Sequence, residues 1–451
     1  MSADGIKPEG RRDFTWPCST RGVASGFRKA NFDSAFKRSS LAPSWTVFNP
    51  GVSIAQLPDD IIDLIVGNLS HVRDFRSCSL LDHRWLPHAQ SRLFKAFLCL
   101  MHRAPCTIYC KAKAQSLENI IKKSPHIAHY FRTLSIELNS EPIQLCAAGS
   151  VSFLLPRMTN LREIRLVCFG PQVLDWSTLA TSHANLFLDC FRRSALCHLS
   201  IEPIANLPAL VLDEVHFLIS LRLHKTSLSP MAVEAKQNTS SPFHTTTSLL
   251  PLEDFHFQSH SSDAEGRTAS LLLQRLAGPS VDTFARLRRL RFYVRSQEDG
   301  FLLSVLRDSA SSLRDLVLDI ESPTQGLGAA FQMLTCLESL VLTFYNITDF
   351  SHVPKDCSRL LRSLAKAVCP LSKFHLLLIP RLHSKSFLNA QESAWNELNF
   401  AILHWVSLGT LRQVNVGSIG LIQLRIAQPS HFLRQCLSGV DAAGILNVSS
   451  A

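Results

Sequence analysis

The chain has 451 residues, of which 46% are hydrophobic and 18% charged, and its formal net charge at pH 7 is +10. This hydrophobic content suffices for a large core and excludes disorder throughout, while the length favours two domains or one extended repeat domain. The positive charge is too thinly spread for the clustered basic surface of a nucleic-acid-binding protein, so we expect no nucleic acid as partner. No apolar stretch approaches the ~18 residues of a membrane span, so we expect no membrane either.

Cysteine usage and the amino-terminal sequence indicate an intracellular protein. The thirteen cysteines are too sparse for a disulfide scaffold, and many lie within apolar runs such as 98–100, where a free thiol packs as a small hydrophobic group. The amino terminus shows no apolar secretory segment. We therefore expect a reducing compartment, the cytoplasm or the nucleus or both. Residues 1–52 lack hydrophobic periodicity and mix charge with Ser, Gly and Pro, which predicts a disordered basic tail.

Residues 53–100 are predicted to form a domain of three short helices. Pro58 suits the first turn of a helix, and Asp59 and Asp60 complement the positive end of its dipole. The spacing of the apolar residues that follow predicts that they share one face of the first helix: Ile61, Ile62, Ile65 and Leu69.

The second helix is expected over 73–82, and the third over 87–97. Their inward residues are expected to be Phe75, Cys78 and Leu81 in the second helix, and Leu93 and Phe94 in the third. Three short helices make a marginal domain, so part of this apolar surface is expected to be covered by a partner.

This segment carries, in order, Leu57-Pro58, a charged pair, an Ile-rich helix, Leu69, Leu80-Leu81, Arg84-Trp85 and Leu93-Phe94. This order of residues resembles an F-box, in particular the F-box proteins that are numerous in fungi. The matching elements cover about a tenth of the chain. The sequence departs from the family where a small Val-Cys pair often precedes the Arg-x-Trp, because Asp82 stands there. The alternative is that these helices only cap the repeat domain that follows.

Residues 101–430 carry a recurring pattern, apolar-x-x-apolar-x-apolar, at steps of 22 to 40 residues. Its ten copies are Phe131/Leu134/Ile136, Leu161/Ile164/Leu166, Leu196/Leu199/Ile201, Leu218/Leu221/Leu223, Leu252/Phe255/Phe257, Leu287/Leu290/Phe292, Leu313/Leu316/Leu318, Leu337/Leu340/Leu342, Leu371/Phe374/Leu376 and Leu411/Val414/Val416. We call these residues the anchors.

Helical spacing lies between several copies of the pattern. It is carried by Leu302, Val305 and Leu306, by Leu360, Leu361, Leu364 and Val368, and by Trp395, Leu398, Ile402 and Val406. Strand and helix alternating at this period resemble leucine-rich repeats, in which neighbouring units share one core. We therefore expect an α/β fold: an F-box followed by an irregular leucine-rich-repeat solenoid with a curved parallel sheet and outer helices. Residues 431–451 are expected to be a tail or cap.

No motif points to catalysis, a cofactor or a metal. Cys106, Cys110, His126 and His129 invite a zinc interpretation, but the histidines are too close for a classical finger and an ordinary amphipathic helix lies between the pairs. Phosphate-binding loops, nucleophile elbows and metalloprotease motifs do not occur. We expect a protein that is not an enzyme.

Residues that alternate with the anchors are expected to point to the concave face of the sheet, because side chains switch faces with period two. In the central repeats these are Arg165, Arg222, His224, His256, Arg289, Arg291 and Tyr293. Our hypothesis is a mildly basic surface that binds an acidic or phosphorylated protein, since Arg offers bidentate contacts to such groups. The alternative is a solvated face without a special role.

The resemblance implies a substrate-recognition adaptor of an SCF-type cullin-RING ubiquitin ligase. The F-box would dock to the adaptor subunit of the ligase and, through it, to the cullin, and the repeats would hold a protein substrate. The residues that the resemblance assigns to that docking face, or to its support, are Leu57, Pro58, Ile61, Ile65, Leu69 and Trp85. The competing interpretation is a leucine-rich-repeat interaction scaffold with no ligase role.

Overall fold

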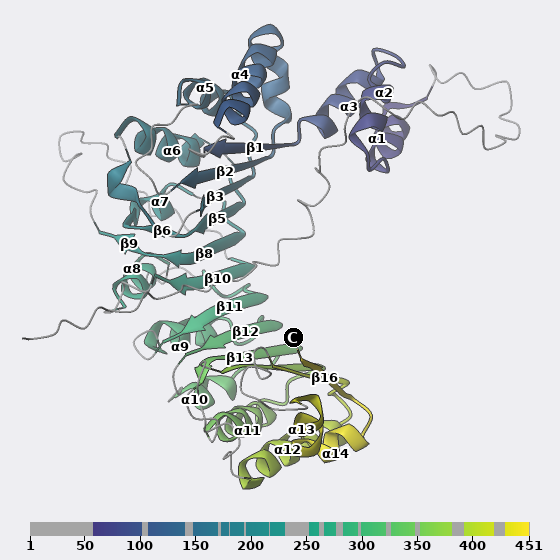
Figure 1. Cartoon of the computed structure of the whole chain (residues 1–451), viewed down its shortest axis with the longest axis vertical. Coiled ribbons are helices and arrows are strands. Elements are labelled where there is room, and N and C mark those ends of the chain that lie inside the picture. The colour runs from purple at the N-terminus through teal and green to yellow at the C-terminus, as the bar shows by residue number, and fades with distance from the viewer. Residues whose placement is uncertain are drawn as a thin grey trace, which may run out of the picture. The chain divides into compact units, whose positions relative to one another are not determined.

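The computed structural model describes residues 57–101, 107–139, 148–169, 173–179, 181–193, 195–215, 217–230, 252–260, 266–276, 283–295, 299–321, 326–347, 352–380, 392–418 and 429–450. In these residues the chain alternates strands and helices (Figure 1). The predicted α/β class, with a large parallel sheet and helices beside it, is confirmed. No helix in the described ranges is long and apolar enough to cross a membrane. The predicted tail, 1–52, lies outside the described residues.

Three short helices begin the described chain: α1 (Asp59–Gly67), α2 (Val72–Cys78) and α3 (Trp85–Leu93). The second helix ends four residues earlier than predicted, and Leu81, expected to be inward, is exposed. The third helix begins and ends earlier than predicted. It ends earlier because residues from Ala96 onward pair as a strand.

Among the described residues, twelve strands form one parallel sheet in chain order. They are β1 (Ala96–Met101), β2 (Thr133–Asn139), β3 (Glu163–Phe169), β5 (His198–Glu202), β8 (Ser220–Thr226), β10 (Asp254–Ser259), β11 (Arg289–Val294), β12 (Asp315–Ile320), β13 (Ser339–Ile347), β14 (Lys373–Pro380), β15 (Gln413–Ser418) and β16 (Leu446–Ser450). Two small parallel pairs accompany it, β4 (Leu174–Asp175) with β6 (Ile204–Ala205), and β7 (Leu207–Pro208) with β9 (Leu228–Ser229). Parallel neighbours need a crossover each time, and the segments between the strands supply it.

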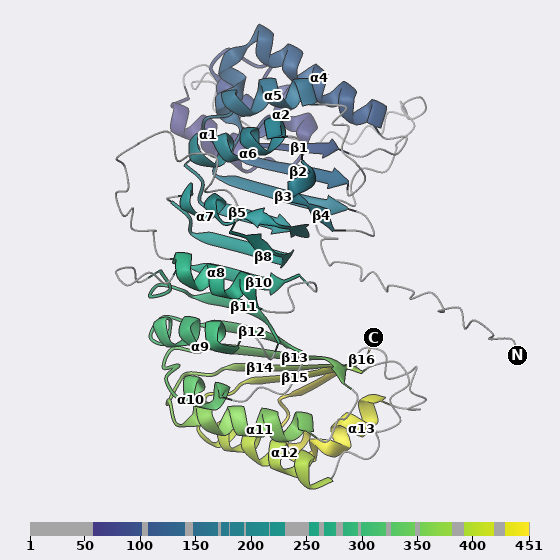
Figure 2. The same cartoon turned by 90° about the vertical axis from the view of Figure 1, so that its left-hand side faces the viewer.

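The crossovers place helices along one face of the sheet, as Figures 1 and 2 both show. They are α4 (Thr107–Lys123), α5 (Ala148–Leu154), α6 (Thr181–Arg193), α7 (Leu210–Asp213), α8 (Arg267–Leu276), α9 (Asp299–Asp308), α10 (Leu327–Phe331), α11 (His352–Ala365) and α12 (Glu392–Ser407). Short 3-10 helices lie at η2 (Pro125–Tyr130), η3 (Leu155–Arg157) and η4 (Trp176–Thr178), and α13 (Pro429–Cys436) and α14 (Ser438–Ala442) precede β16. The opposite face of the sheet, formed by the residues that alternate with the anchors, is here called the open face.

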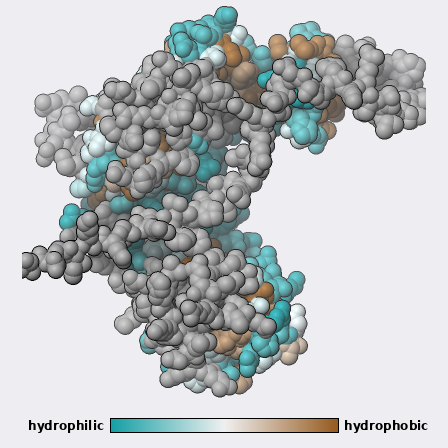
Figure 3. Space-filling model, viewed as in Figure 1, coloured by the Kyte–Doolittle hydropathy of each residue, from teal (hydrophilic) through white to brown (hydrophobic). Residues whose placement is uncertain are grey.

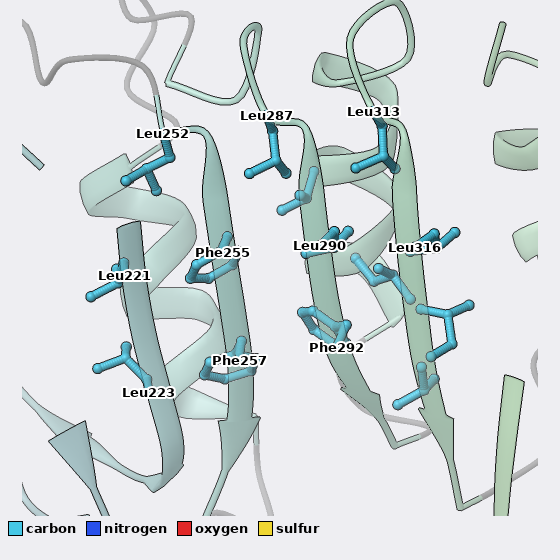
Figure 4. Close-up of a cluster of buried hydrophobic side chains, with 14 of the residues drawn as sticks. Leu221, Leu223, Leu252, Phe255, Phe257, Leu287, Leu290, Phe292, Leu313 and Leu316 are labelled. Carbon is cyan, nitrogen blue, oxygen red and sulfur yellow. The ribbon is translucent and has the colours of Figure 1, made fainter. Parts of the chain in front are cut away.

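All ten predicted anchor triplets are buried, and they lie in register. Leu221, Phe255, Leu290 and Leu316 occupy equivalent positions on successive strands, and the second and third anchors form parallel rows (Figure 4). Each of the ten repeats thus contributes three apolar side chains, at equivalent positions, to one continuous core. The core also includes the inner residues of the helices. Neighbouring units therefore bury surface that a single unit would leave in water.

A repeated backbone contact keeps this register although the repeats differ in length. The Arg162 carbonyl accepts hydrogen bonds from the N–H groups of Cys197 and His198, at 2.8 and 2.9 Å. The Arg288 carbonyl does the same for Arg314 and Asp315, both at 2.9 Å. The extra residues of the longer repeats are thereby confined to the segments outside the strands.

Two strands were not predicted. Phe94, Phe97 and Cys99 have the anchor spacing, and the phenyl rings of Phe94 and Phe131 lie 6.1 Å apart as first anchors of β1 and β2. Leu446 and Val448 continue the rows in β16. The sheet therefore begins inside the segment predicted to be helical and continues into the predicted tail or cap.

An aromatic cluster forms the centre of the core. The ring of Phe301, on α9, lies 5.7 Å from that of Phe257, 5.8 Å from that of Phe292 and 6.1 Å from that of Phe255. Two successive strands, β10 and β11, thus meet one helix residue. Of the predicted helix residues, Val368 is wrong: it follows α11 and is 86% exposed.

Candidate interaction surfaces

Ion pairs orient α1 against α3. Arg84 Nη2 lies 2.7 Å from Asp59 Oδ1, and Asp63 lies 3.4 Å from His88 Nδ1 and 3.8 Å from Arg92 Nη2. Asp59 and Asp63 are four residues apart, as are the three basic residues, so both sets lie along single helix faces. The hydrogen bond from Arg84 lowers the pKa of Asp59.

This orientation decides which apolar residues of α1 are covered. Ile62 and Val66 are fully buried, together with Trp85 and Ala89 of α3. The prediction that Ile61, Ile62, Ile65 and Leu69 share one face is therefore wrong. Because Ile62 lies on the buried face of α1, its neighbour Ile61 is exposed, and so is Ile65 one turn further along the helix.

An apolar surface remains exposed on α1–α3. Leu64, Ile61 and Ile65 are 62, 41 and 38% exposed. Of the fourteen large hydrophobic residues that are exposed in the described residues, seven lie between Ile61 and Leu86. They are Ile61, Leu64, Ile65, Val72, Leu80, Leu81 and Leu86. Figure 3 shows hydrophobic residues, in brown, among hydrophilic ones over these helices.

The six residues predicted for adaptor docking are divided by the structure. Ile61, Ile65 and Pro58 are exposed, and Leu57 and Leu69 are half-buried. Trp85 is buried between the helices and supports the surface instead of lining it. The prediction missed Leu64, whose spacing of three residues from Ile61 could have placed it on the same face.

Asp82, the departure from the F-box pattern, has a local role. Its carboxylate accepts a hydrogen bond from the Arg84 N–H at 3.3 Å, and its carbonyl accepts one from the Trp85 N–H at 3.0 Å. These contacts form the turn that starts α3, a position where aspartate is favoured.

The open face carries all seven residues predicted for substrate binding. Arg222, His256 and Arg291 occupy one row across β8, β10 and β11. Arg165 lies in the same row on β3, beyond Ser200 of β5. The remaining three flank that row: Arg289 nearer the start of its strand, and His224 and Tyr293 nearer the end.

Carboxylates neutralise much of this surface. Arg222 Nη2 lies 2.9 Å from Asp254 Oδ2, to which the Ser220 hydroxyl also donates at 3.0 Å. Arg289 is a second cationic partner of Asp254, at 3.7 Å. Arg291 Nε lies 3.0 Å from Asp319 Oδ2. Both aspartates are buried, so each requires a cation beside it.

The pairing extends to the predicted residue nearest the start of the sheet, because Arg165 Nη2 lies 3.8 Å from Glu202 Oε1. The predicted mildly basic surface is thus close to electrical balance in its central row. The sequence shows these acids, but not which arginine each one meets.

The two histidines do not add charge near pH 7. Burial lowers the pKa of His256 to about 3, assisted by the nearby Arg291. Burial likewise lowers the pKa of His224, whose ring centroid lies 5.7 Å from that of His256. His224 Nδ1 is buried without a hydrogen-bond partner among the described residues. This pair therefore presents neutral, flat side chains between the arginines.

A pair of tyrosines continues the surface toward β13. The rings of Tyr293 and Tyr345 lie 5.7 Å apart, and the Tyr345 hydroxyl donates to Asp319 Oδ1 at 3.4 Å. Arg295 lies over the Tyr293 ring at 5.3 Å and pairs with Glu321 at 3.2 Å. Burial raises the pKa of Tyr345 to about 12, so the hydroxyl stays protonated and able to donate.

The described part of the chain shows no cluster of metal ligands, and the pocket described below is small. No group of three or more possible metal ligands is found there. His126 instead approaches Gln90 at 3.3 Å, His129 approaches Thr159 at 3.2 Å, and Cys106 lies outside the described residues. A pocket of about 70 Å³ between η3 and α6, lined by Leu155, Met158 and other residues, is far smaller than typical ligand pockets.

Two extended surfaces thus distinguish this chain: the apolar surface of α1–α3 and the open face of the sheet. Comparison with known proteins adds no identity to either of them. No family model matches the chain, and no curated protein matches it in sequence.

Proposed function

We propose that the chain is a substrate-recognition adaptor of an SCF-type cullin-RING ubiquitin ligase. In this proposal α1–α3 act as an F-box that docks to the adaptor subunit of the ligase, and irregular leucine-rich repeats hold the substrate on the open face. The observation that carries it is the concentration of exposed apolar side chains on α1–α3, since such surfaces mark protein interaction sites.

The chemistry of the proposed function is proximity. The chain would bring lysines of a bound protein close to a ubiquitin-charged enzyme held elsewhere in the assembly, which raises their effective concentration. No catalytic group of this chain takes part. An interaction surface on each part is sufficient for that role.

The second candidate, an interaction scaffold whose helices only cap the sheet, has its own support. Phe94 packs on Phe131 of the first core layer, and Gln90 approaches His126. A cap would explain these contacts. It gives no reason for Leu64, Ile61 and Ile65 to stay exposed on the other side of α1.

The test measures the affinity of the full chain for the purified adaptor subunit of the ligase. The variant replaces Ile61, Leu64 and Ile65 by Ser, and together their exposed fractions equal about one and a half side chains. At about 2 kcal/mol for each buried aliphatic side chain, docking would lose about 3 kcal/mol, or roughly a hundredfold in Kd.

Phe400→Ser with Leu408→Ser is the matched control, because both residues are exposed on or next to α12, far along the chain from α1. These changes should leave the affinity unchanged. Lack of measurable binding by the unaltered chain, or a triple variant that binds within threefold of it, would refute the ligase proposal.

A further inference from the structure

The open face has a surplus of positive charge at its β8–β11 side. Arg222 and Arg289 share the single carboxylate of Asp254. Arg291 is the third arginine on these strands, and its carboxylate partner, Asp319, lies on the next strand, β12. On β8, β10 and β11 the open face thus carries three arginines and one carboxylate, that of Asp254, whereas Asp315 and Asp319 lie on β12.

The β12–β14 side of the same face carries four aliphatic residues among polar ones such as Asp315, Lys373 and His375. The row that holds Arg291 on β11 continues with Val317 on β12 and Val341 on β13. On β14, Leu377 lies beyond Thr343 in the adjacent row and Ile379 follows at the next outward position. All four aliphatic residues are partly exposed although they belong to central strands of the sheet.

The two sides meet at a rigid junction. Asp319, only 4% exposed, accepts hydrogen bonds from Arg291 and Tyr345, and the ring of Tyr345 lies against that of Tyr293. Arginine and tyrosine dominate the energetics of many protein interfaces, especially where neighbours hold them in place. The buried carboxylate does this here, so little side-chain entropy is lost on binding.

We propose that the open face binds an extended segment of a partner protein in which acidic side chains are separated from large apolar ones by a short spacer. The carboxylates lie over β8–β11, and the apolar side chains lie over β12–β14. This inference deepens the proposed function, because it names the chemistry of the substrate segment. The binding itself does not depend on the ligase role.

The strand spacing sets the length of the spacer. Four steps separate β8 from β13, which is about 19 Å at about 4.8 Å per step. An extended peptide advances about 3.3 Å per residue, so the acidic and apolar groups should lie about six residues apart. A nucleic acid would satisfy the arginines, but it offers no aliphatic side chains to Val341 and Leu377.

The experiment measures binding of fluorescein-labelled peptides to the full chain by fluorescence anisotropy. The main probe carries three glutamates and three leucines separated by a Gly-Ser spacer of about six residues. One comparison peptide has serines in place of the leucines, and another has serines in place of the glutamates. We expect each comparison peptide to bind at least tenfold more weakly than the main probe.

Variants locate the binding on the open face. Arg289→Glu should weaken the main probe about fivefold and make its binding less sensitive to salt. Val341→Ser should weaken the main probe and leave the affinity of the leucine-free peptide unchanged. Arg307→Glu on α9 and Phe400→Ser on α12 are the matched controls on the helix side, and neither should alter binding.

The inference is overturned if the main probe does not bind, if it binds no better than the leucine-free peptide, or if the open-face variants bind like the controls. Single-stranded oligonucleotide binding tighter than the main probe would overturn it in favour of a nucleic acid. Adaptor affinity, measured on the same preparations, separates the two proposals. Peptide binding without adaptor binding removes only the ligase role, and adaptor binding without peptide binding removes only this inference.

Discussion

Replacing His256 by Asn should reduce the pH dependence of folding stability. Burial, with Arg291 nearby, lowers the pKa of this histidine from 6.5 to about 3 in the folded chain. The unfolded chain keeps the ordinary value and binds a proton as the pH falls below about 6.5. The contribution of neutral His256 to stability is therefore complete above that pH and is lost progressively as the pH falls toward 3.

The loss between pH 7 and pH 5 follows from these two values. At pH 5 the histidine of the unfolded chain is protonated, because its pKa of 6.5 lies about 1.5 units above the pH. The histidine of the folded chain stays neutral, because its pKa of about 3 lies below the pH. At about 1.4 kcal/mol per unit, the free energy of unfolding falls by about 2 kcal/mol because of this one residue. Asn cannot titrate, so its variant lacks this part of the loss.

The assay is urea unfolding followed by tryptophan fluorescence at both pH values, for the unaltered chain and for His256→Asn. His404→Asn is the control, since His404 is exposed on α12 and its removal should leave the loss unchanged. If His256→Asn loses as much stability as the unaltered chain between the two pH values, His256 is not held neutral by burial and the reasoning fails.

Three further substitutions test the core and its backbone. Val368→Asn should stabilise the chain by about 1 kcal/mol, measured as a higher urea midpoint, because a β-branched residue is strained at φ 53°; a lower midpoint would contradict this. Phe301→Ala should cost about 3–5 kcal/mol and speed amide hydrogen exchange in β10 and β11, since it empties the aromatic cluster; unchanged exchange there would count against a shared core. Thr268→Val should cost about 1–3 kcal/mol in the same urea assay, because the buried Leu228 N–H loses the hydroxyl that accepts its hydrogen bond at 3.1 Å, and a neutral effect would show that another acceptor replaces it.

The repeat core could be predicted because its signal is local. Leu290 and Phe292 alternate with polar residues, and the same spacing recurs in every unit. The alternation therefore predicts which face of each strand is buried. The first strand was missed for a related reason. Phe94, Phe97 and Cys99 follow a helix without a break, and a spacing of three residues also fits a helix.

The surfaces were harder to predict, since they depend on contacts between segments. Ile61 and Ile62 are equally apolar, and only the ion pair of Asp59 with Arg84 and the packing on α3 decide which of them is covered. Likewise, Arg222 and Arg291 lie at equivalent positions of their strands, and the sequence does not show which acids they meet. In the structure Asp254 pairs with two arginines and Asp319 with one.

The amino-acid sequence by itself determined the strand faces, the alternation of strand and helix, and the buried rows of Leu and Phe, because hydrophobic periodicity is a property of neighbours along the chain. Only the tertiary structure decided the charge balance of the open face and the exposed side of α1. Repeats of unequal length bring residues together across strands and helices, and which charges meet there depends on register and orientation, which no single segment encodes.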